Sequence, residues 1–332
     1  MYEQFFIIFA LVIMGFFLGR RGIMDENTDA GINKLIMKFI VPCMFIYKIG
    51  SLEMTGETMR EFFFTLAVFT ACLFAGGLYA YLYSRIRKFP RENSNVAEFC
   101  MVLPNNAFMG FPVASTFFGE FGLLMMAATN AAMNIYMFSY GVILMDRNGG
   151  EGGGSKGEAD APAADRQDAA GHSFKEAALR IIKHLMNPMM ASLVIALVIC
   201  GFGIKLPGAL NELLGQISGL CTPLAMLYVG STLSRGKLLE VLKSSVVIES
   251  GLNKIIVMPL MTGALVYFLP LSPIAKAMCV LAAAMPTAAM TSMLAGDYKQ
   301  DVKLAGMILL VTTALSAATM LGFIQLINMY IM

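Results

Sequence analysis

One stretch decides the fold of this chain: Cys100-Met101-Val102-Leu103-Pro104-Asn105-Asn106-Ala107-Phe108-Met109-Gly110-Phe111-Pro112. It places two prolines, a glycine and two adjacent asparagines inside a long apolar run. Proline removes a backbone hydrogen bond from a helix, so this run predicts a helix broken near its middle. In hydrocarbon the freed backbone groups must face protein or a water-filled cavity. The amides of Asn105 and Asn106 can satisfy those groups or bind a ligand, because each amide both donates and accepts.

A second broken run, near the other end of the chain, reads Ala284-Met285-Pro286-Thr287-Ala288-Ala289-Met290-Thr291-Ser292. Pro286 lies 182 residues after Pro104 (104 to 286), and paired breaks of this kind point to a transporter's binding site. Thr287 and Thr291 are expected one helical turn apart on one face. If the broken helices cross, the N-termini of their second halves meet and favour an anion such as a carboxylate. The alternative is that these polar residues only cap kinked helices.

The composition is that of a membrane protein. Hydrophobic residues make up 58% of the 332-residue chain and charged residues 14%, with a mean hydropathy of +0.70. Soluble domains carry about 25% charged residues. A net charge of +2 gives no indication of a nucleic-acid partner. The expected fold is therefore an all-α polytopic protein embedded in a lipid bilayer.

Ten apolar runs approach the length of about 20 residues that a membrane-spanning helix needs. They lie at about 3–19, 32–49, 61–84, 96–117, 121–145, 185–204, 212–233, 245–269, 273–295 and 303–330. The polar, partly glycine-rich segment 147–173 predicts a flexible linker. It separates a first five-helix unit, 1–146, from a second, 174–332. Five is odd, so the second unit begins on the opposite side of the membrane and the two repeats are inverted.

Lysine and arginine are concentrated on one side of these ten helices. That side holds Arg20, Arg21, Arg85, Arg87, Lys88, Arg91, Arg235, Lys237, Lys243, Lys299 and Lys303. The opposite side holds Arg60, Lys205 and Lys276, with Lys48 near its edge. Cytoplasmic loops carry the excess of positive charge, so we expect the linker in the cytoplasm and both termini outside the cell membrane.

A second proline pair supports the repeat. Pro42 and Pro223 lie 181 residues apart (42 to 223), and Tyr47 follows Pro42 by five positions. These residues predict either kinks that shape packing or contacts with a ligand.

Polar residues in other spans have simpler interpretations. Asn130 and Asn134, one turn apart, predict a polar stripe that joins helices by hydrogen bonds. Lys254 can lie within a turn or so of Glu249 near the cytoplasmic end of its helix. The two are expected to snorkel as a pair, with gating or proton coupling as the alternative.

Catalytic and metal-binding signatures are missing from the sequence. There is no HExxH, GxSxG or P-loop motif, and the chain has two histidines and no CxxC pair among its six cysteines. We therefore expect no enzymatic activity, no cofactor and no metal.

The residues Asn105 to Pro112 resemble the N-x-G-F-x-G-x-P signature of the auxin efflux carrier family, and Val41 to Phe45 resemble its L-P-x-x-x-F stretch. Ala107 departs from the motif, standing where the family has glycine. The resemblance implies ten helices as two inverted five-helix repeats, with the fourth and ninth helices crossing at their breaks. It also places Asn105 at the crossover and makes a homodimer plausible.

These observations together predict a secondary transporter of a small organic anion, with an elevator-like or rocking motion around the crossed helices. The resemblance implies malate, malonate or an auxin-like acid as substrate. The candidate substrate-binding residues are Pro104, Asn105, Asn106, Pro286, Thr287 and Thr291. One alternative is a cation-coupled symporter of a larger amphipathic anion, as in the bile-acid branch. Another is a membrane sensor that binds ligand without moving it, although the linker is too short and glycine-rich to be a signalling domain.

Overall fold

The computed structural model describes residues 2–52, 55–146, 188–235 and 244–330. Every regular element in these residues is a helix, which agrees with the predicted all-α class. The predicted linker at 147–173 lies outside them. Five helical stretches are long and apolar enough to cross a membrane: Glu26–Ile49, Gly56–Ile86, Gly119–Met145, Gly208–Ser234 and Ser245–Tyr267.

The first half of the chain is helical with four single π-helical turns. Its elements are α1 (Tyr2–Arg20), α2 (Glu26–Leu35), η1 (Ile36–Ile40), α3 (Val41–Met44), η2 (Phe45–Ile49), α4 (Gly56–Ile86), α5 (Arg91–Val102), η3 (Asn106–Gly110), α6 (Phe111–Phe117), α7 (Gly119–Tyr136), η4 (Met137–Gly141) and α8 (Val142–Asp146). Side-chain oxygens cap the N-termini of two of these helices. Before α2, Asp25 accepts from the Thr28 N–H at 2.7 Å, and before α4, Thr55 accepts from the Thr58 N–H at 3.1 Å.

The second half repeats this mixture of long and broken helices. Its elements are α10 (Pro188–Gly201), α11 (Gly208–Gly219), α12 (Cys221–Ser234), α14 (Ser245–Leu252), η7 (Asn253–Val257), α15 (Met258–Tyr267), α16 (Pro273–Ala284), α17 (Met290–Asp297) and α18 (Val302–Tyr330). Pro223 lies in the first turn of α12, just after α11 ends, and Pro42 lies in α3 between two π-helical turns. Each proline therefore marks an irregular point in its span.

The helices α1 and α10, one from each half, end in the same backbone turn. Gly22 and Gly203 have φ of +70° and +61°, the left-handed region in which glycine is favoured. The N–H groups of Ile23 and Ile204 then donate to the carbonyl five residues earlier, at 3.0 and 2.9 Å. The two glycines are 181 residues apart (22 to 203), the spacing of Pro42 and Pro223.

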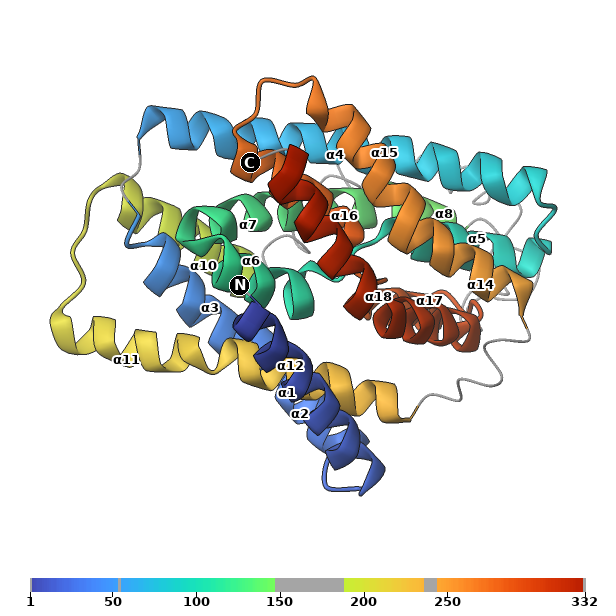
Figure 1. Ribbon diagram of the computed structural model, residues 1–332, viewed down its shortest axis with the longest axis horizontal. Helices are drawn as coiled ribbons and strands as arrows, with labels where there is room; N and C mark the ends of the chain where they lie inside the picture. Colours follow the sequence, from blue (N-terminus) through green and yellow to red (C-terminus); the bar gives the residue numbers. More distant parts are fainter. Residues whose placement is uncertain (1, 53–54, 147–187, 236–243, 331–332) are drawn as a thin grey trace, which may run out of the picture.

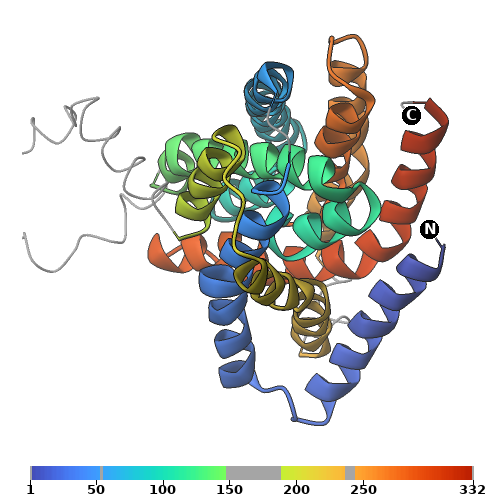
Figure 2. The same cartoon turned by 90° about the vertical axis from the view of Figure 1, so that its left-hand side faces the viewer.

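The helices pack in two groups. In the first group, α1 lies along α12, α10 lies against η2, and α11 lies against α3. In the second, α4 packs on α7, α16 on both α7 and α15, and α18 on α14 and α17. Figure 1 shows α4 and the α11–α12 pair on opposite sides of the molecule, and Figure 2 shows α1 and α2 diverging from their shared turn. The groups touch where α12 meets η3, α6 and α18, and where η2 meets α7.

Glycines allow α1 and α12 to approach each other closely. A Cβ atom added to Gly15 would lie 2.2 Å from the carbonyl oxygen of Leu227, and one added to Gly230 would lie 2.0 Å from that of Val12. Neither distance is possible for a real Cβ, so the backbones themselves are in contact here. Small residues at such an interface are typical of tightly packed membrane helices.

Candidate functional site

The two helix breaks meet inside the second group. Pro104 and Thr287 form an isolated antiparallel β-bridge. The N–H of Asn105 donates to the carbonyl of Pro286 at 2.8 Å, and the N–H of Ala288 donates to that of Leu103 at 3.1 Å. Each break therefore supplies partners for backbone groups that the other leaves free, as a hydrocarbon environment requires.

Side chains add further hydrogen bonds at this crossover. The Thr287 hydroxyl donates to the carbonyl of Cys100 at 2.8 Å, and the Thr287 N–H donates to the Thr312 hydroxyl at 3.1 Å. Asn105 accepts on Oδ1 from the Phe108 N–H at 3.4 Å and so caps the second half of its helix. Thr287 is fully buried, whereas Asn105 keeps 6% of its surface exposed.

A cavity of about 520 Å³ adjoins the crossover, between the two helix groups. Asn105 and Ala289 line it, one from each broken helix. Its walls come from α12 and α18: Tyr228, Val229, Thr232, Leu233, Gly306, Met307, Leu309, Leu310 and Thr313. Three charged residues at helix ends complete the lining, namely Glu26, Arg235 and Lys303.

The electrostatics of this cavity favour an anion. Asn105 and Ala289 each precede a helical segment, and helix N-termini carry partial positive charge and free N–H groups. Arg235 is neutralised by its ion pair with Asp29, and Lys303 and Glu26 carry opposite charges, so the helix N-termini supply the positive potential of the cavity. The small size and mixed lining suit a compact organic molecule with an acidic group.

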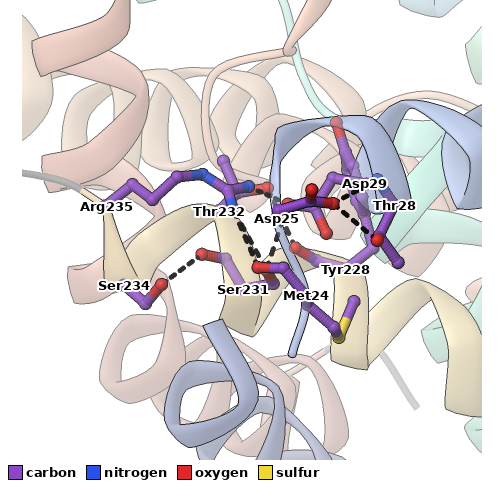
Figure 3. A network of polar contacts seen from close by, with 9 residues as sticks. All are labelled: Met24, Asp25, Thr28, Asp29, Tyr228, Ser231, Thr232, Ser234 and Arg235. Atoms are coloured by element: carbon purple, nitrogen blue, oxygen red, sulfur yellow. Dashed lines mark hydrogen bonds and ion pairs between the residues drawn. The ribbon is translucent and has the colours of Figure 1, made fainter. Parts of the chain in front are cut away.

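Arg235 is held at the cavity by a polar network that joins α12 to the turn between α1 and α2 (Figure 3). It forms an ion pair with Asp29, and its Nη1 donates to the Met24 carbonyl at 3.2 Å and the Ser231 hydroxyl at 3.4 Å. Ser231 also donates to Asp29 Oδ2 at 3.1 Å. Asp29 is only 4% exposed, so the pair is partly shielded from solvent.

The structure places one of the six predicted substrate-binding residues at the cavity and the other five behind its lining. Among the described lining residues, Asn105 is the one member of that set. Asn106 is fully buried and donates from Nδ2 to the Thr129 hydroxyl at 3.3 Å, toward α7. Thr291 donates to the Ala288 carbonyl at 2.7 Å. Pro104 and Pro286 contribute the backbone links described above.

The expectation that Thr287 and Thr291 share a helix face is wrong. Residues 285–289 are not helical, and α17 begins only at Met290. Thr287 belongs to the break and Thr291 to the helix that follows it. Helical periodicity cannot be carried across a proline break, because the backbone changes direction there.

The second proline pair lies away from the cavity lining. Pro42 and Pro223 do not border the cavity, and Tyr47 packs against Gly215 of α11, where an added Cβ would lie 3.1 Å from its ring. Tyr228, five residues after Pro223, does line the cavity, and its ring lies 4.7 Å from that of Phe108. The sequence spacing points to both tyrosines, since each follows its proline by five positions.

Asn130 and Asn134 are buried in α7. The side-chain oxygen and nitrogen of Asn130 have no hydrogen-bond partner within the described part of the chain, and neither does Nδ2 of Asn134. The interhelical hydrogen bonds predicted for Asn130 are therefore not found among those residues.

The predicted pairing of Lys254 with Glu249 is wrong. Glu249 accepts two hydrogen bonds from Arg87, both at 2.7 Å, and one from the Tyr83 hydroxyl at 3.0 Å. Lys254 is fully buried and does not snorkel; its Nζ donates to the carbonyl of Ala283 at 2.9 Å. Glu249 faces the end of α4 while Lys254 faces α16, so one helix directs the two charges to different neighbours.

Sequence reasoning also missed several lining residues. Arg235 and Lys303 were informative only as loop charges, Thr313 only as a polar residue that joins helices, and Thr232 carried no specific signal. All four lie near the crossover because α12 and α18 pack beside it, a relation that residue spacing does not contain.

Comparison with known proteins identifies the family. A family model described as membrane transport protein matches residues 1–324. An uncharacterised transporter of Methanothermobacter thermautotrophicus is 23% identical over 314 residues, 94% of each chain. One from Methanocaldococcus jannaschii is 25% identical over 316 residues, 93% of each chain, and Escherichia coli YfdV is 22% identical over 323, covering 96% of this chain and 92% of that protein. The chain therefore belongs to the membrane transport protein family, the auxin efflux carrier family that its sequence resembles, and is a multi-pass membrane transporter.

Proposed function

We propose that this transporter moves a small organic anion across the cytoplasmic membrane by secondary active transport with alternating access. The observation that carries the proposal is the cavity of about 520 Å³ that Asn105 and Ala289 line, one from each broken helix. Ligand pockets in proteins range from about 300 to 1,000 Å³. The cavity volume falls within that range and leaves room for a carboxylate such as malate, malonate or an auxin-like acid.

In this proposal the substrate carboxylate lies beside Asn105. The amide Nδ2 can donate to it, while Oδ1 keeps its bond to the Phe108 N–H. Lys303 draws the anion into the cavity or meets its second acidic group, while Arg235 keeps its ion pair with Asp29. The candidate residues Thr287, Thr291 and Asn106 support the crossover backbone and its packing.

We also propose the ten-helix inverted repeat, with units 1–146 and 174–332 joined by a cytoplasmic linker and both termini outside. The matching turns at Gly22 and Gly203 and the bonded breaks at Pro104 and Pro286 support it. In that orientation Glu26, Arg235 and Lys303 lie at cytoplasmic helix ends. The structure would then represent an inward-facing state.

The division into two helix groups suggests how access alternates. The cavity lies where α12 and α2 of the first group face α18 and the crossover of the second. Contacts across the boundary include aromatic pairs such as Phe45 with Phe111, at 5.0 Å. Such apolar contacts can slide, so an elevator-like displacement of the second group would carry the site across the membrane. The homodimer that the family resemblance implies would anchor the first group, and cross-linking in membranes tests it.

Uptake by reconstituted vesicles tests the proposal. Labelled dicarboxylates, monocarboxylates and indole acids are compared with and without a Na⁺ or pH gradient, using Asn105→Ala and the exposed-surface control Asn211→Ala on α11. A hydrogen bond to a charged group contributes about 1.5–3 kcal/mol, so Asn105→Ala should weaken substrate binding roughly 10- to 150-fold. Uptake at low substrate concentration should disappear while folded protein remains in the membrane.

Three outcomes would count against this assignment. Normal uptake by Asn105→Ala would remove Asn105 from the site. The absence of flux for every anion tested would favour the sensor alternative, whereas flux of bile-acid-like anions that requires Na⁺ would favour the larger-substrate symporter.

A further inference from the structure

Lys254 is an ionisable side chain buried in a membrane-spanning helix. It is fully inaccessible, and the hydrogen bond that the structure gives it within the described residues goes to a backbone carbonyl, that of Ala283. Glu249, five residues earlier on the same helix, pairs with Arg87, and Glu98 of α5 accepts from the Ser84 hydroxyl. Ionisable residues at such positions are costly and are usually functional.

The carbonyl that Lys254 contacts belongs to the end of a half-helix. Ala283 lies in the last turn of α16, which ends at Ala284, directly before the second break. The last carbonyls of a helix lack intrahelical partners and carry partial negative charge. In transporters with broken helices, the C-terminal ends of half-helices and unwound carbonyls coordinate the coupling cation. Here the side-chain amine of Lys254 occupies such a position.

The first break shows that the fold does not need a charge there. At the corresponding end of α5, the carbonyls of Cys100 and Leu103 accept from the Thr287 hydroxyl and the Ala288 N–H, which are neutral donors. The residue 181 positions before Lys254 is Leu73, an apolar side chain (73 to 254). The first break thus closes with neutral donors alone, so a lysine at the second is not dictated by the need to satisfy backbone carbonyls.

We propose that the Lys254 ammonium is a built-in cation that stands in place of a coupling ion such as Na⁺ at the carbonyl end of α16. It holds the crossover in its anion-binding form and adds positive potential behind the cavity. Lys254 is a positioning residue, because it acts through the backbone of the break and does not line the cavity. The inference rests on the proposed anion transport, which should consequently proceed without sodium.

The first test uses the purified full chain and does not depend on transport. Lys254→Ala removes three carbons and the amine, a space that n-propylammonium matches. We expect propylammonium chloride, compared with equal choline chloride, to raise the unfolding temperature of Lys254→Ala. Lys254→Met, which fills the space without charge, should not respond. Lys48→Ala is the matched control, because Lys48 is partly buried and donates to the Ser115 hydroxyl at 2.6 Å, away from the breaks.

The second test measures uptake of whichever labelled carboxylate the wild type transports. Wild-type KM should be the same in Na⁺ and in choline, and Lys254→Met should raise KM by about 2- to 30-fold, the effect of a charge at a helix terminus. Propylammonium should lower the KM of Lys254→Ala and leave that of Lys254→Met unchanged.

The outcomes separate this inference from the proposed function. No thermal response of Lys254→Ala to propylammonium, an equal response of Lys254→Met, or Na⁺-dependent uptake by the wild type would overturn it. If the wild type moves no carboxylate at all, the transport proposal fails. The thermal measurement then still decides whether Lys254 fills a cation site.

Discussion

The contact between α1 and α12 offers a sharp test of the structure, through Gly230→Ala. A Cβ atom at position 230 would lie 2.0 Å from the Val12 carbonyl oxygen and 2.8 Å from the Phe16 nitrogen. Both atoms belong to the backbone of α1, so no change of side-chain rotamer can relieve the clash. Other residues of α12, Tyr228, Val229, Thr232 and Leu233, line the cavity, and any displacement of α12 therefore also alters the site.

The expected magnitude follows from these distances. Ordinary contact begins at 3.4 Å, so the helices would have to separate by about 1.4 Å at this point. Overpacking of this kind costs typically 1–3 kcal/mol, and the gain in helix propensity from glycine to alanine, about 1 kcal/mol, offsets only part of it. The upper end of that cost leaves about 2 kcal/mol, which for a chain of 332 residues is a fall in unfolding temperature of roughly 3 °C.

Thermal unfolding of the purified protein in detergent measures this effect, and vesicle uptake measures its consequence for KM. Gly31→Ala is the matched control, because Gly31 lies within α2 with no atom within 4 Å of an added Cβ. That variant should be as stable as the wild type or slightly more stable, since alanine restricts the unfolded chain.

A double variant sharpens the prediction. An added Cβ at Gly15 clashes with the Leu227 carbonyl at 2.2 Å, and the same separation of the two helices relieves both clashes. Gly15→Ala with Gly230→Ala should therefore cost less than the sum of the single changes. If Gly230→Ala unfolds at the same temperature as Gly31→Ala, the close approach of α1 and α12 is refuted.

Two further predictions concern the polar contacts. Thr287→Val keeps the shape of the side chain but leaves the buried Cys100 carbonyl without its donor, so unfolding should become easier by about 1–3 kcal/mol; an unchanged unfolding temperature would contradict the crossover bond. Asp29→Asn should weaken the partly shielded pair with Arg235, and a double-mutant cycle with Arg235→Gln should show a coupling of about 1–3 kcal/mol in unfolding. If the two single changes in unfolding free energy add up to that of the double variant, the ion pair between Asp29 and Arg235 is refuted.

The positions of the helix breaks could be predicted because each is a local property. Pro104 and Pro286 lack the N–H that a continuous helix needs, and no distant residue can restore it. The same holds for the turns at Gly22 and Gly203, where the backbone requires a left-handed residue. The apolar composition likewise indicated a helical membrane protein before any contact was known.

The directions of individual side chains could not be predicted in the same way. Asn105 and Asn106 are neighbours in sequence, yet one lines the cavity and the other bonds Thr129. Near a break the helical period is interrupted, so residue spacing no longer gives the face. The predicted pairing of Glu249 with Lys254 was wrong for a related reason. Residues of other helices pack against each of them and provide its partner, Arg87 for Glu249 and the Ala283 carbonyl for Lys254.

The sequence by itself therefore determined that this chain is apolar and helical. It also determined that two of the helices are broken, at prolines separated by nearly the same number of residues as the second proline pair. Only the tertiary structure decided which groups complete each interruption: Pro286 for Asn105, Leu103 for Ala288, and Lys254 for the end of α16. The physical reason is the range of each interaction. The lack of a backbone N–H is a property of the proline itself. The hydrogen-bond partner that replaces it comes from a segment far away in the chain and is in place only after the helices have packed.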